Sequence, residues 1–146
     1  MSCLWPFGKS NRPAVPGNEG PVYDYTQIGE KFYPMVDVAI FRQNFQLFKI
    51  RALVDSGASL SVFLPDFANL LDIDVKSGKS IQLDSLTTSV KGYLHELSVE
   101  VSKKRFTLPV AFLDKIHTPF NILGREVFFE QFVITFDETK KIVVLK

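Results

Sequence analysis

Residues 52–58 read ALVDSGA, and this short stretch decides how the rest of the chain is interpreted. Its first three residues are apolar, as in a strand that is buried on both faces. The run ends at Asp55, although a carboxylate is costly to place in a protein core. Ser56 and Gly57 follow, which favour a turn, and a glycine lets a backbone N–H approach the carboxylate closely. The stretch therefore predicts a tight turn that presents Asp55 from the end of a buried strand.

Alternation of apolar and polar residues with a period of two dominates the sequence on both sides of this turn. Val36, Val38 and Ile40 share one face of a predicted strand at residues 35–41. Further strands are predicted at residues 46–54, 59–64, 81–83, 93–101, 105–113, 133–136 and 142–145. Short helices are predicted at residues 65–71, which begin with a proline, and at residues 125–132. Many short strands with two short helices predict a mainly β fold, a barrel or a closed sandwich.

The composition indicates one globular domain with a different N-terminal segment. The chain has 146 residues, of which 46% are hydrophobic and 23% are charged. Residues 1–22 contain four prolines and three glycines and hardly any periodic apolar pattern. Such a segment buries too little surface to offset the entropy of ordering it. We therefore predict a flexible N-terminal arm at residues 1–22 and one folded domain at residues 23–146.

Several classes of function are disfavoured by the composition. One cysteine excludes a disulfide within the chain, and the two histidines, His95 and His117, lie 22 positions apart and match no metal-ligand spacing. A formal net charge of +1 gives no overall field that would recruit nucleic acid or an anionic membrane. No run approaches the ~18 apolar residues of a membrane-spanning helix. We expect a cytoplasmic protein with no metal, no organic cofactor, and neither nucleic acid nor a membrane as a partner.

A second element lies at residues 121–125, NILGR, where two apolar residues and a glycine precede the second predicted helix. By itself the Asp-Ser-Gly triplet is an ordinary turn sequence, because all three residue types favour turns. The apolar run before the triplet, the small Ala58 after it and the second element downstream together favour a functional interpretation.

These two elements resemble the signature of the retroviral-type aspartic proteases, the retropepsins. The family pattern of two hydrophobic residues followed by Asp-[Ser/Thr]-Gly-Ala is matched by residues 53–58, and its hydrophobic-hydrophobic-Gly-Arg stretch by residues 122–125. Residues 25–28, YTQI, and residues 124–132, GREVFFEQF, are similar to the bacterial single-domain branch. The resemblance covers residues 23–146 and implies a closed β-barrel of the retropepsin (acid protease) type.

The resemblance implies an aspartic endopeptidase in which Asp55 is the catalytic residue and water is the nucleophile. Such a site needs two carboxylates that share one proton, whereas the chain has one Asp-Ser-Gly triplet. A homodimer with Asp55 from each subunit is therefore expected. In that dimer Ser56 would bridge the two loops, and the Gly57 N–H would hold the carboxylates in plane. The other residues expected to support the active-site loop are Ala58, Ile122, Leu123 and Gly124.

The flap departs from the family pattern. Retropepsins usually cover the substrate with a glycine-rich hairpin, whereas the corresponding residues 82–91 contain no glycine. A stiffer flap closes less readily, which predicts slow turnover or few substrates. The residues expected to cover the substrate are Asp84, Ser85, Leu86, Thr87 and Thr88.

Arg125 marks a second departure. Many retropepsins carry an aspartate four residues after the catalytic one, which can pair with this arginine, but here that position is Ser59. Arg125 therefore needs another carboxylate, and the alternatives are Glu126, Asp66 and a carboxylate of the other subunit.

Three functional interpretations remain open at this point. The first is an endopeptidase that acts as a homodimer on an extended peptide or unfolded protein. The second is a catalytically weak or inactive dimer of the same fold that binds peptides or assembles complexes, which the glycine-free flap favours. The third is a β-barrel interaction domain with a chance Asp-Ser-Gly turn. Residues 143–145 fit either a dimer-interface strand or an edge of the core.

Overall fold

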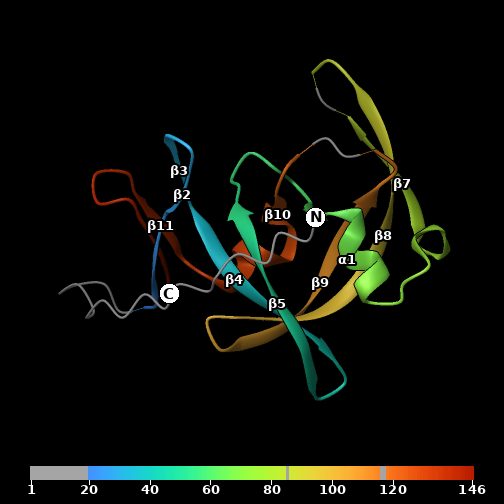
Figure 1. The fold of residues 1–146 in the computed structure, drawn as a ribbon, viewed down its shortest axis with the longest axis horizontal. Coiled ribbons are helices and arrows are strands. Elements are labelled where there is room, and N and C mark those ends of the chain that lie inside the picture. Colours follow the sequence, from blue (N-terminus) through green and yellow to red (C-terminus); the bar gives the residue numbers. More distant parts are fainter. Residues whose placement is uncertain (1–19, 85, 116–117) are drawn as a thin grey trace.

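A computed structural model describes residues 20–84, 86–115 and 118–146 (Figure 1). Residues 1–19 of the expected arm lie outside the described residues, and so do Ser85 and His117. The strands are β1 (Val22–Asp24), β2 (Thr26–Ile28), β3 (Lys31–Tyr33), β4 (Met35–Arg42), β5 (Phe45–Val54), β6 (Ser61–Phe63), β7 (Lys79–Asp84), β8 (Ser89–Val101), β9 (Lys104–Leu113), β10 (Asn121–Leu123), β11 (Ile134–Asp137) and β12 (Ile142–Leu145). The helical segments are α1 (Pro65–Leu70), the 3₁₀ turn η1 (Val75–Ser77) and the irregular segment η2 (Arg125–Phe129).

Six of these strands close into a barrel. Their order is β4-β5-β10-β6-β9-β8, and β4 pairs with β8 to complete the ring, with Ile40 opposite Val99. The seventh strand of this sheet, β7, pairs with β8 and extends the sheet beyond the ring. The prediction of a mainly β, closed barrel with short helices is therefore confirmed.

The barrel interior is filled by the alternate residues that the sequence pattern predicts. Val36, Val38 and Ile40 of β4 are all buried, as the strand prediction requires. The largest fully buried side chains are Phe63, Phe112 and Phe128. The phenylalanine-rich composition is thus used to fill the core, where each ring contributes a large apolar area.

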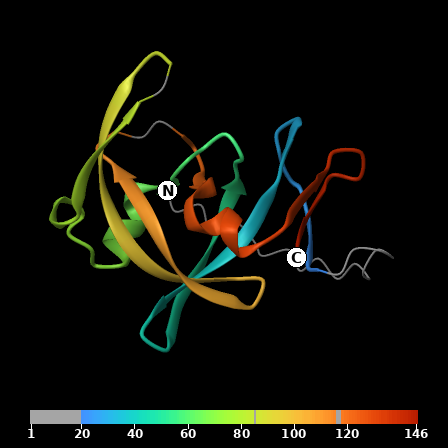
Figure 2. The same cartoon turned by 180° about the vertical axis from the view of Figure 1, so that it is seen from behind.

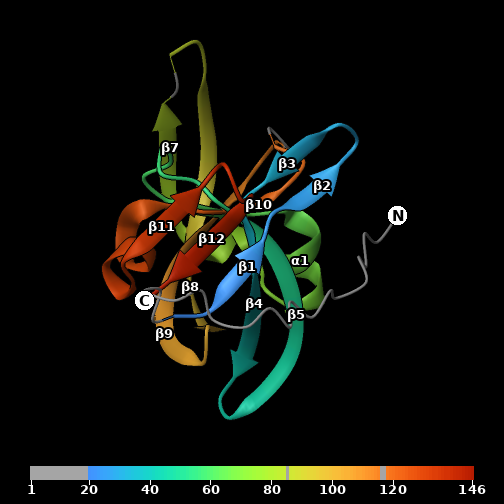
Figure 3. The same cartoon turned by 90° about the vertical axis from the view of Figure 1, so that its left-hand side faces the viewer.

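A second, three-stranded sheet has the order β1-β12-β11 (Figure 3). Its central strand, β12, is buried along its whole length and is paired on both edges. Residues 142–145 therefore belong to the core of one chain, and they have no free edge with which to form an interface strand. The strands β1, β2 and β3 have three residues each, which is too short for a clear period-two signal, and the sequence analysis did not find them.

Of the two predicted helices, the first is confirmed and the second is only partly right. The first, α1, begins at Pro65 as expected. The second is interrupted at Glu126 (φ −61°, ψ 124°) and Val127 (φ 65°, ψ −53°), although the segment still packs against β9 on the face seen in Figure 2. The interruption arises because the first amides of this segment bind a distant loop, while Phe128 turns into the core. Within the described ranges, no helix is both long and apolar enough to cross a membrane.

Tyr25, between β1 and β2, binds the hairpin of β11 and β12. Its hydroxyl donates to Oε1 of Glu138 at 2.9 Å, and Lys141 Nζ donates to Oε2 of the same carboxylate at 2.9 Å. The Tyr25 N–H also donates to the Lys141 carbonyl at 2.8 Å. Burial, together with the neighbouring carboxylate of Glu138, raises the pKa of Tyr25 from 10.0 to about 12.

This raised pKa predicts a loss of stability at alkaline pH. Between pH 10 and pH 12 the unfolded chain releases the tyrosine proton while folded Tyr25 keeps it, so the free energy of unfolding falls as the pH rises. We expect Tyr25 to contribute on the order of 1–2 kcal/mol to this decline. Burial also raises the pKa of Tyr23, so part of the decline should remain in a Tyr25→Phe variant.

The measurement is urea unfolding of both proteins at about pH 9, 10 and 11, where the decline should be steeper in the wild type. Tyr33→Phe serves as the control, because the Tyr33 hydroxyl makes no hydrogen bond within the described ranges. If the free energy of unfolding falls equally steeply with pH in the wild type and in Tyr25→Phe, the expectation is contradicted.

Candidate active site

Asp55 lies where β5 meets the inserted strand β10. These two strands run parallel, with Leu53 opposite Ile122 and Val54 opposite Leu123. The pairing continues one step beyond the end of β5, because the Asp55 N–H donates to the Leu123 carbonyl at 3.0 Å. The predicted Asp-Ser-Gly turn thus begins at a backbone position that is fixed by the second sequence element.

The turn itself binds one of the two oxygens of the Asp55 carboxylate. The Gly57 N–H donates to Oδ1 of Asp55 at 2.8 Å, and the Ala58 N–H donates to the Asp55 carbonyl at 3.3 Å. No donor within the described ranges contacts Oδ2. Asp55 is half-buried, while Ser56 and Gly57 are exposed. The carboxylate therefore sits at the surface of a single chain, with one oxygen oriented by its own loop.

The second element holds the opposite side of the loop. The Arg125 N–H donates to the Ala58 carbonyl at 2.9 Å, and the Glu126 N–H donates to the Ser59 carbonyl at 2.8 Å. Gly124 is buried at this crossing, where a Cβ atom would lie 2.9 Å from the Leu60 nitrogen and closer still to the Leu60 carbonyl. Such distances are shorter than van der Waals contact, so this backbone approach requires glycine.

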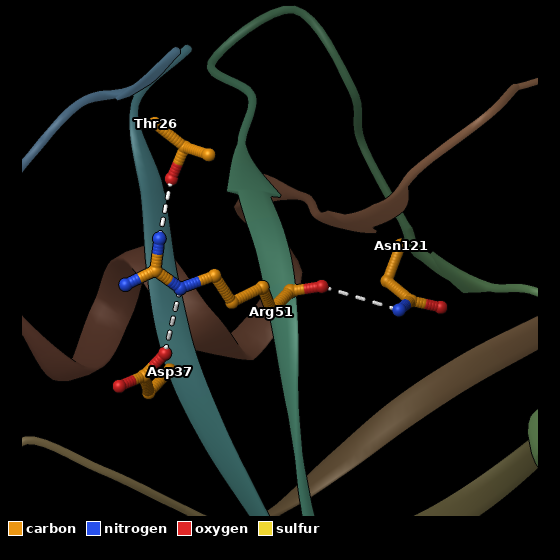
Figure 4. A network of polar contacts seen from close by, with 4 residues as sticks. All are labelled: Thr26, Asp37, Arg51 and Asn121. Atoms are coloured by element: carbon orange, nitrogen blue, oxygen red, sulfur yellow. Dashed lines mark hydrogen bonds and ion pairs between the residues drawn. The ribbon is translucent and has the colours of Figure 1, made fainter. Parts of the chain in front are cut away.

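Two buried polar side chains complete the frame of the site, and neither was predicted from the sequence to have a role in it. Ser61 Oγ accepts the Gly124 N–H at 3.1 Å. Asn121 accepts the Leu64 N–H at 2.9 Å and donates to the Arg51 carbonyl at 3.2 Å (Figure 4). The available signal was that Ser61 alternates with Phe63, which places a polar residue at an inward-facing position of a predicted strand.

Arg51 connects the strand that carries Asp55 to its neighbours. Its Nε donates to Oδ1 of Asp37 at 3.1 Å, and its Nη1 donates to Oγ1 of Thr26 at 2.6 Å (Figure 4). These contacts join β5 to β4 and to β2. They fix the segment of β5 that precedes Asp55 from the outer side of the barrel.

The region that corresponds to the flap forms a β-hairpin of β7 and β8. It projects beyond the barrel on the side where residues 55–60 emerge (Figures 1 and 2). Gln82 Nε2 donates to Ser89 Oγ at 2.6 Å, and Ser89 Oγ donates to Oδ1 of Asp84 at 2.6 Å. Of the expected flap residues at the tip, Leu86, Thr87 and Thr88 are exposed, and Ser85 lies outside the described residues.

The structure narrows the alternatives for Arg125. Its side chain is exposed, and within the described part of the chain it pairs with neither Glu126 nor Asp66. The third alternative, a carboxylate of the other subunit, stays a prediction. His95 packs against Phe112 and contacts the Val75 carbonyl at 2.8 Å. Among the described residues, no group of three or more His, Cys, Asp or Glu side chains is arranged to hold a metal ion.

Comparison with known protein families identifies the family of this chain. A family model described as aspartyl protease matches residues 37–127, which include Asp55 and residues 121–125. The chain belongs to the aspartyl protease family. The family is of the retropepsin-like type, as the sequence resemblance indicated, whereas membership of the bacterial branch stays a prediction. No curated protein matches the chain.

The close backbone approach at Gly124 gives a direct test of the frame of the protease site. We expect Gly124→Ala to lower the free energy of unfolding by about 1–3 kcal/mol or more. The added methyl group would overlap backbone atoms of Leu60, which cannot move aside as the end of a flexible side chain could. Urea unfolding measures this loss.

Gly57→Ala is the comparison variant for this test. A Cβ at Gly57 would contact Oδ1 of Asp55 at 3.2 Å and meets no backbone atom within 4 Å. The loss of stability should therefore be clearly smaller than for Gly124→Ala. Equal stability of Gly124→Ala and the wild type would show that residues 60 and 124 do not approach as described.

Proposed function

We propose that the protein is an aspartic endopeptidase whose active site forms between two copies of the chain, each of which contributes Asp55. The observation that supports this proposal is the half-buried Asp55 carboxylate, which is oriented through Oδ1 by the Gly57 N–H and has no donor at Oδ2 in the part of the chain that the structure describes. One such carboxylate cannot act as both general base and general acid in a single step. A second Asp55 would supply the missing group.

The proposed chemistry follows from two carboxylates that share one proton. Like charges a few ångströms apart cannot both be ionised, so one Asp55 carries a proton and the other does not. The ionised carboxylate takes a proton from a water molecule, which attacks the peptide carbonyl carbon. The protonated carboxyl gives its proton to the carbonyl oxygen as the tetrahedral intermediate forms. The proton taken from water then passes to the leaving nitrogen as the C–N bond breaks, and a hydroxyl of the intermediate returns a proton to the other carboxylate, so the pair again shares one proton. The substrate would be an extended peptide that binds beneath the β7–β8 hairpin.

The exposed parts of the loop support a symmetric dimer at this face. Ser56 and Gly57 are exposed in one chain, so two loops can meet around a twofold axis without opening the barrel. Arg125, whose amide binds the same loop, has an exposed side chain without an ion-pair partner in the described ranges. A carboxylate of the second subunit would complete that pair.

Replacement of Asp55 by asparagine tests catalysis directly. We expect Asp55→Asn to lower cleavage of an unfolded protein pool by about 10²–10⁴-fold, because the amide cannot take or give the proton. Asp66→Asn makes the same chemical change at an exposed position on α1 and should cleave as the wild type does. Product formation would be followed by gel and mass spectrometry at high and low protein concentration. Activity of the wild type should fall faster than linearly on dilution, and a fully active monomer would refute the dimeric site.

The shared proton also predicts the pH dependence of cleavage. The rate needs one ionised and one protonated carboxyl group, so the pH profile should be bell-shaped, with its maximum on the acidic side of neutrality. The measurement is kcat/KM across roughly pH 3 to 8, with circular dichroism at each pH to show that the protein stays folded. A maximum at alkaline pH would be incompatible with this chemistry.

The tip of the β7–β8 hairpin favours a second candidate function, peptide binding without cleavage. The Gln82–Ser89–Asp84 hydrogen bonds link the two strands just below the tip, which stiffens a segment that must move to admit and release substrate. If the wild type and Asp55→Asn both remain folded dimers and neither cleaves at any pH, this candidate is favoured. Fluorescence anisotropy with a labelled apolar peptide would then test for binding.

A further inference from the structure

The frame around Asp55 contains two polar side chains that the proposed chemistry does not use. Ser61 is completely buried and Asn121 is 5% exposed, and they are the two buried polar residues of the described ranges. A polar group is costly to bury unless it is hydrogen-bonded. Asn121 is the first residue of the three-residue strand β10, and Ser61 binds Gly124, the residue that follows this strand. The last carbonyl of β10 binds the Asp55 backbone.

Ser61 fixes the end of β10 that lies next to Asp55. Its Oγ accepts the N–H of Gly124, the first residue after β10, at 3.1 Å. Gly124 is buried against the backbone of Leu60, so no water can replace this acceptor without a shift of the chain. Removal of the hydroxyl would leave a buried backbone donor without a partner, which favours displacement of residues 123–124.

Asn121 fixes the other end of the same strand. Its side chain bridges the Arg51 carbonyl of β5 and the Leu64 N–H that follows β6. A strand of three residues makes few ladder hydrogen bonds of its own, so these two side chains supply much of what holds it between its neighbours.

One backbone hydrogen bond joins β10 to Asp55. The carbonyl oxygen of Leu123, which lies between Asn121 and Gly124 in the chain, accepts the Asp55 N–H at 3.0 Å. The direction of the carboxylate then depends on this backbone contact and on the Gly57 N–H. We propose that Ser61 and Asn121 are positioning residues, which orient the Asp55 carboxylate through the Leu123 carbonyl. The catalytic consequence of this inference rests on the proposed function.

The first experiment separates substrate binding from the chemical step. Ser61→Ala should lower kcat by about 10- to 100-fold, because small displacements of a reacting group cost that much. KM should stay within about twofold of the wild-type value, because Ser61 is buried and does not reach the substrate. Val110→Ala is the matched control, since Val110 lies opposite Ser61 in the β6–β9 ladder and is also fully buried, but its side chain makes no hydrogen bond. It should lower the melting temperature and leave kcat near that of the wild type.

The second experiment tests the hydrogen bond between the Asp55 amide and the Leu123 carbonyl without measuring catalysis. Hydrogen exchange followed by NMR should show the Asp55 amide exchanging at least about tenfold faster in Ser61→Ala, while Val110→Ala keeps the wild-type ratio between the Asp55 amide and the core amides. Asn121→Ala should change the exchange rate of the Asp55 amide in the same direction, because it removes the side-chain hydrogen bonds that fix the other end of β10.

The outcomes distinguish this inference from the proposed function. A wild-type kcat in folded Ser61→Ala overturns the inference, and so does an equal loss of kcat in Val110→Ala. A fall in kcat without faster exchange at Asp55 also overturns it, because the effect would not pass through Leu123. If the wild type shows no cleavage that depends on Asp55, the proposed function fails, and the exchange measurement alone decides whether Ser61 positions the loop.

Discussion

The insertion of β10 between β5 and β6 is the constraint on which the rest of this structure depends. β5 and β6 are consecutive in the sequence, and two such strands would ordinarily pair as a hairpin. Here β10 occupies the space between them, parallel to β5 and antiparallel to β6. The loop of residues 55–60 must therefore cross over the end of β10. Asp55 is the first residue of that crossing, and its amide meets the last carbonyl of β10.

The crossing also explains the irregular geometry of the segment that follows. The amides of Arg125 and Glu126 bind carbonyls of the loop, whereas Phe128 must reach the core. Both demands are met only if the chain bends between them, and Val127 carries the bend with φ 65°. A positive φ is rare for a β-branched residue and carries a strain energy. The strain is tolerated here because the contacts on either side of Val127 leave the backbone no other route.

Much of the fold could be predicted from the sequence, because the long strands alternate clearly. Strands such as β4, β8 and β9 have one face in the core, so their side chains record the period directly. The two halves of the site frame could also be predicted, because Asp55 and Gly124 each break a local expectation: a carboxylate after a buried run, and a glycine before an apolar helix. The family resemblance then placed these halves in one site.

The remaining features depend on contacts between residues far apart in the chain. The interruption of η2 is set by hydrogen bonds to residues 58 and 59, which no local pattern at residues 125–132 reveals. The contacts of Ser61 and Asn121 have the same character. The inward-facing position marks Ser61 as unusual, but its partner, the Gly124 N–H, lies 63 residues away in the chain. The core position of β12 is a further case, since an apolar terminal strand has the same sequence pattern whether it pairs within one chain or between two.

The self-contained barrel has a consequence for the proposed dimer. Six strands close the ring within one chain, and β12, at the C-terminal end, is paired on both edges by β11 and β1. The ring and β12 are thus paired without a strand from a second copy, unlike in dimers whose terminal strands pair across the interface. In the proposed dimer the contacts between subunits would include the exposed residues Ser56, Gly57 and Arg125. Because the proposed site needs Asp55 from two copies, protein concentration would control how much of the protein carries a complete site.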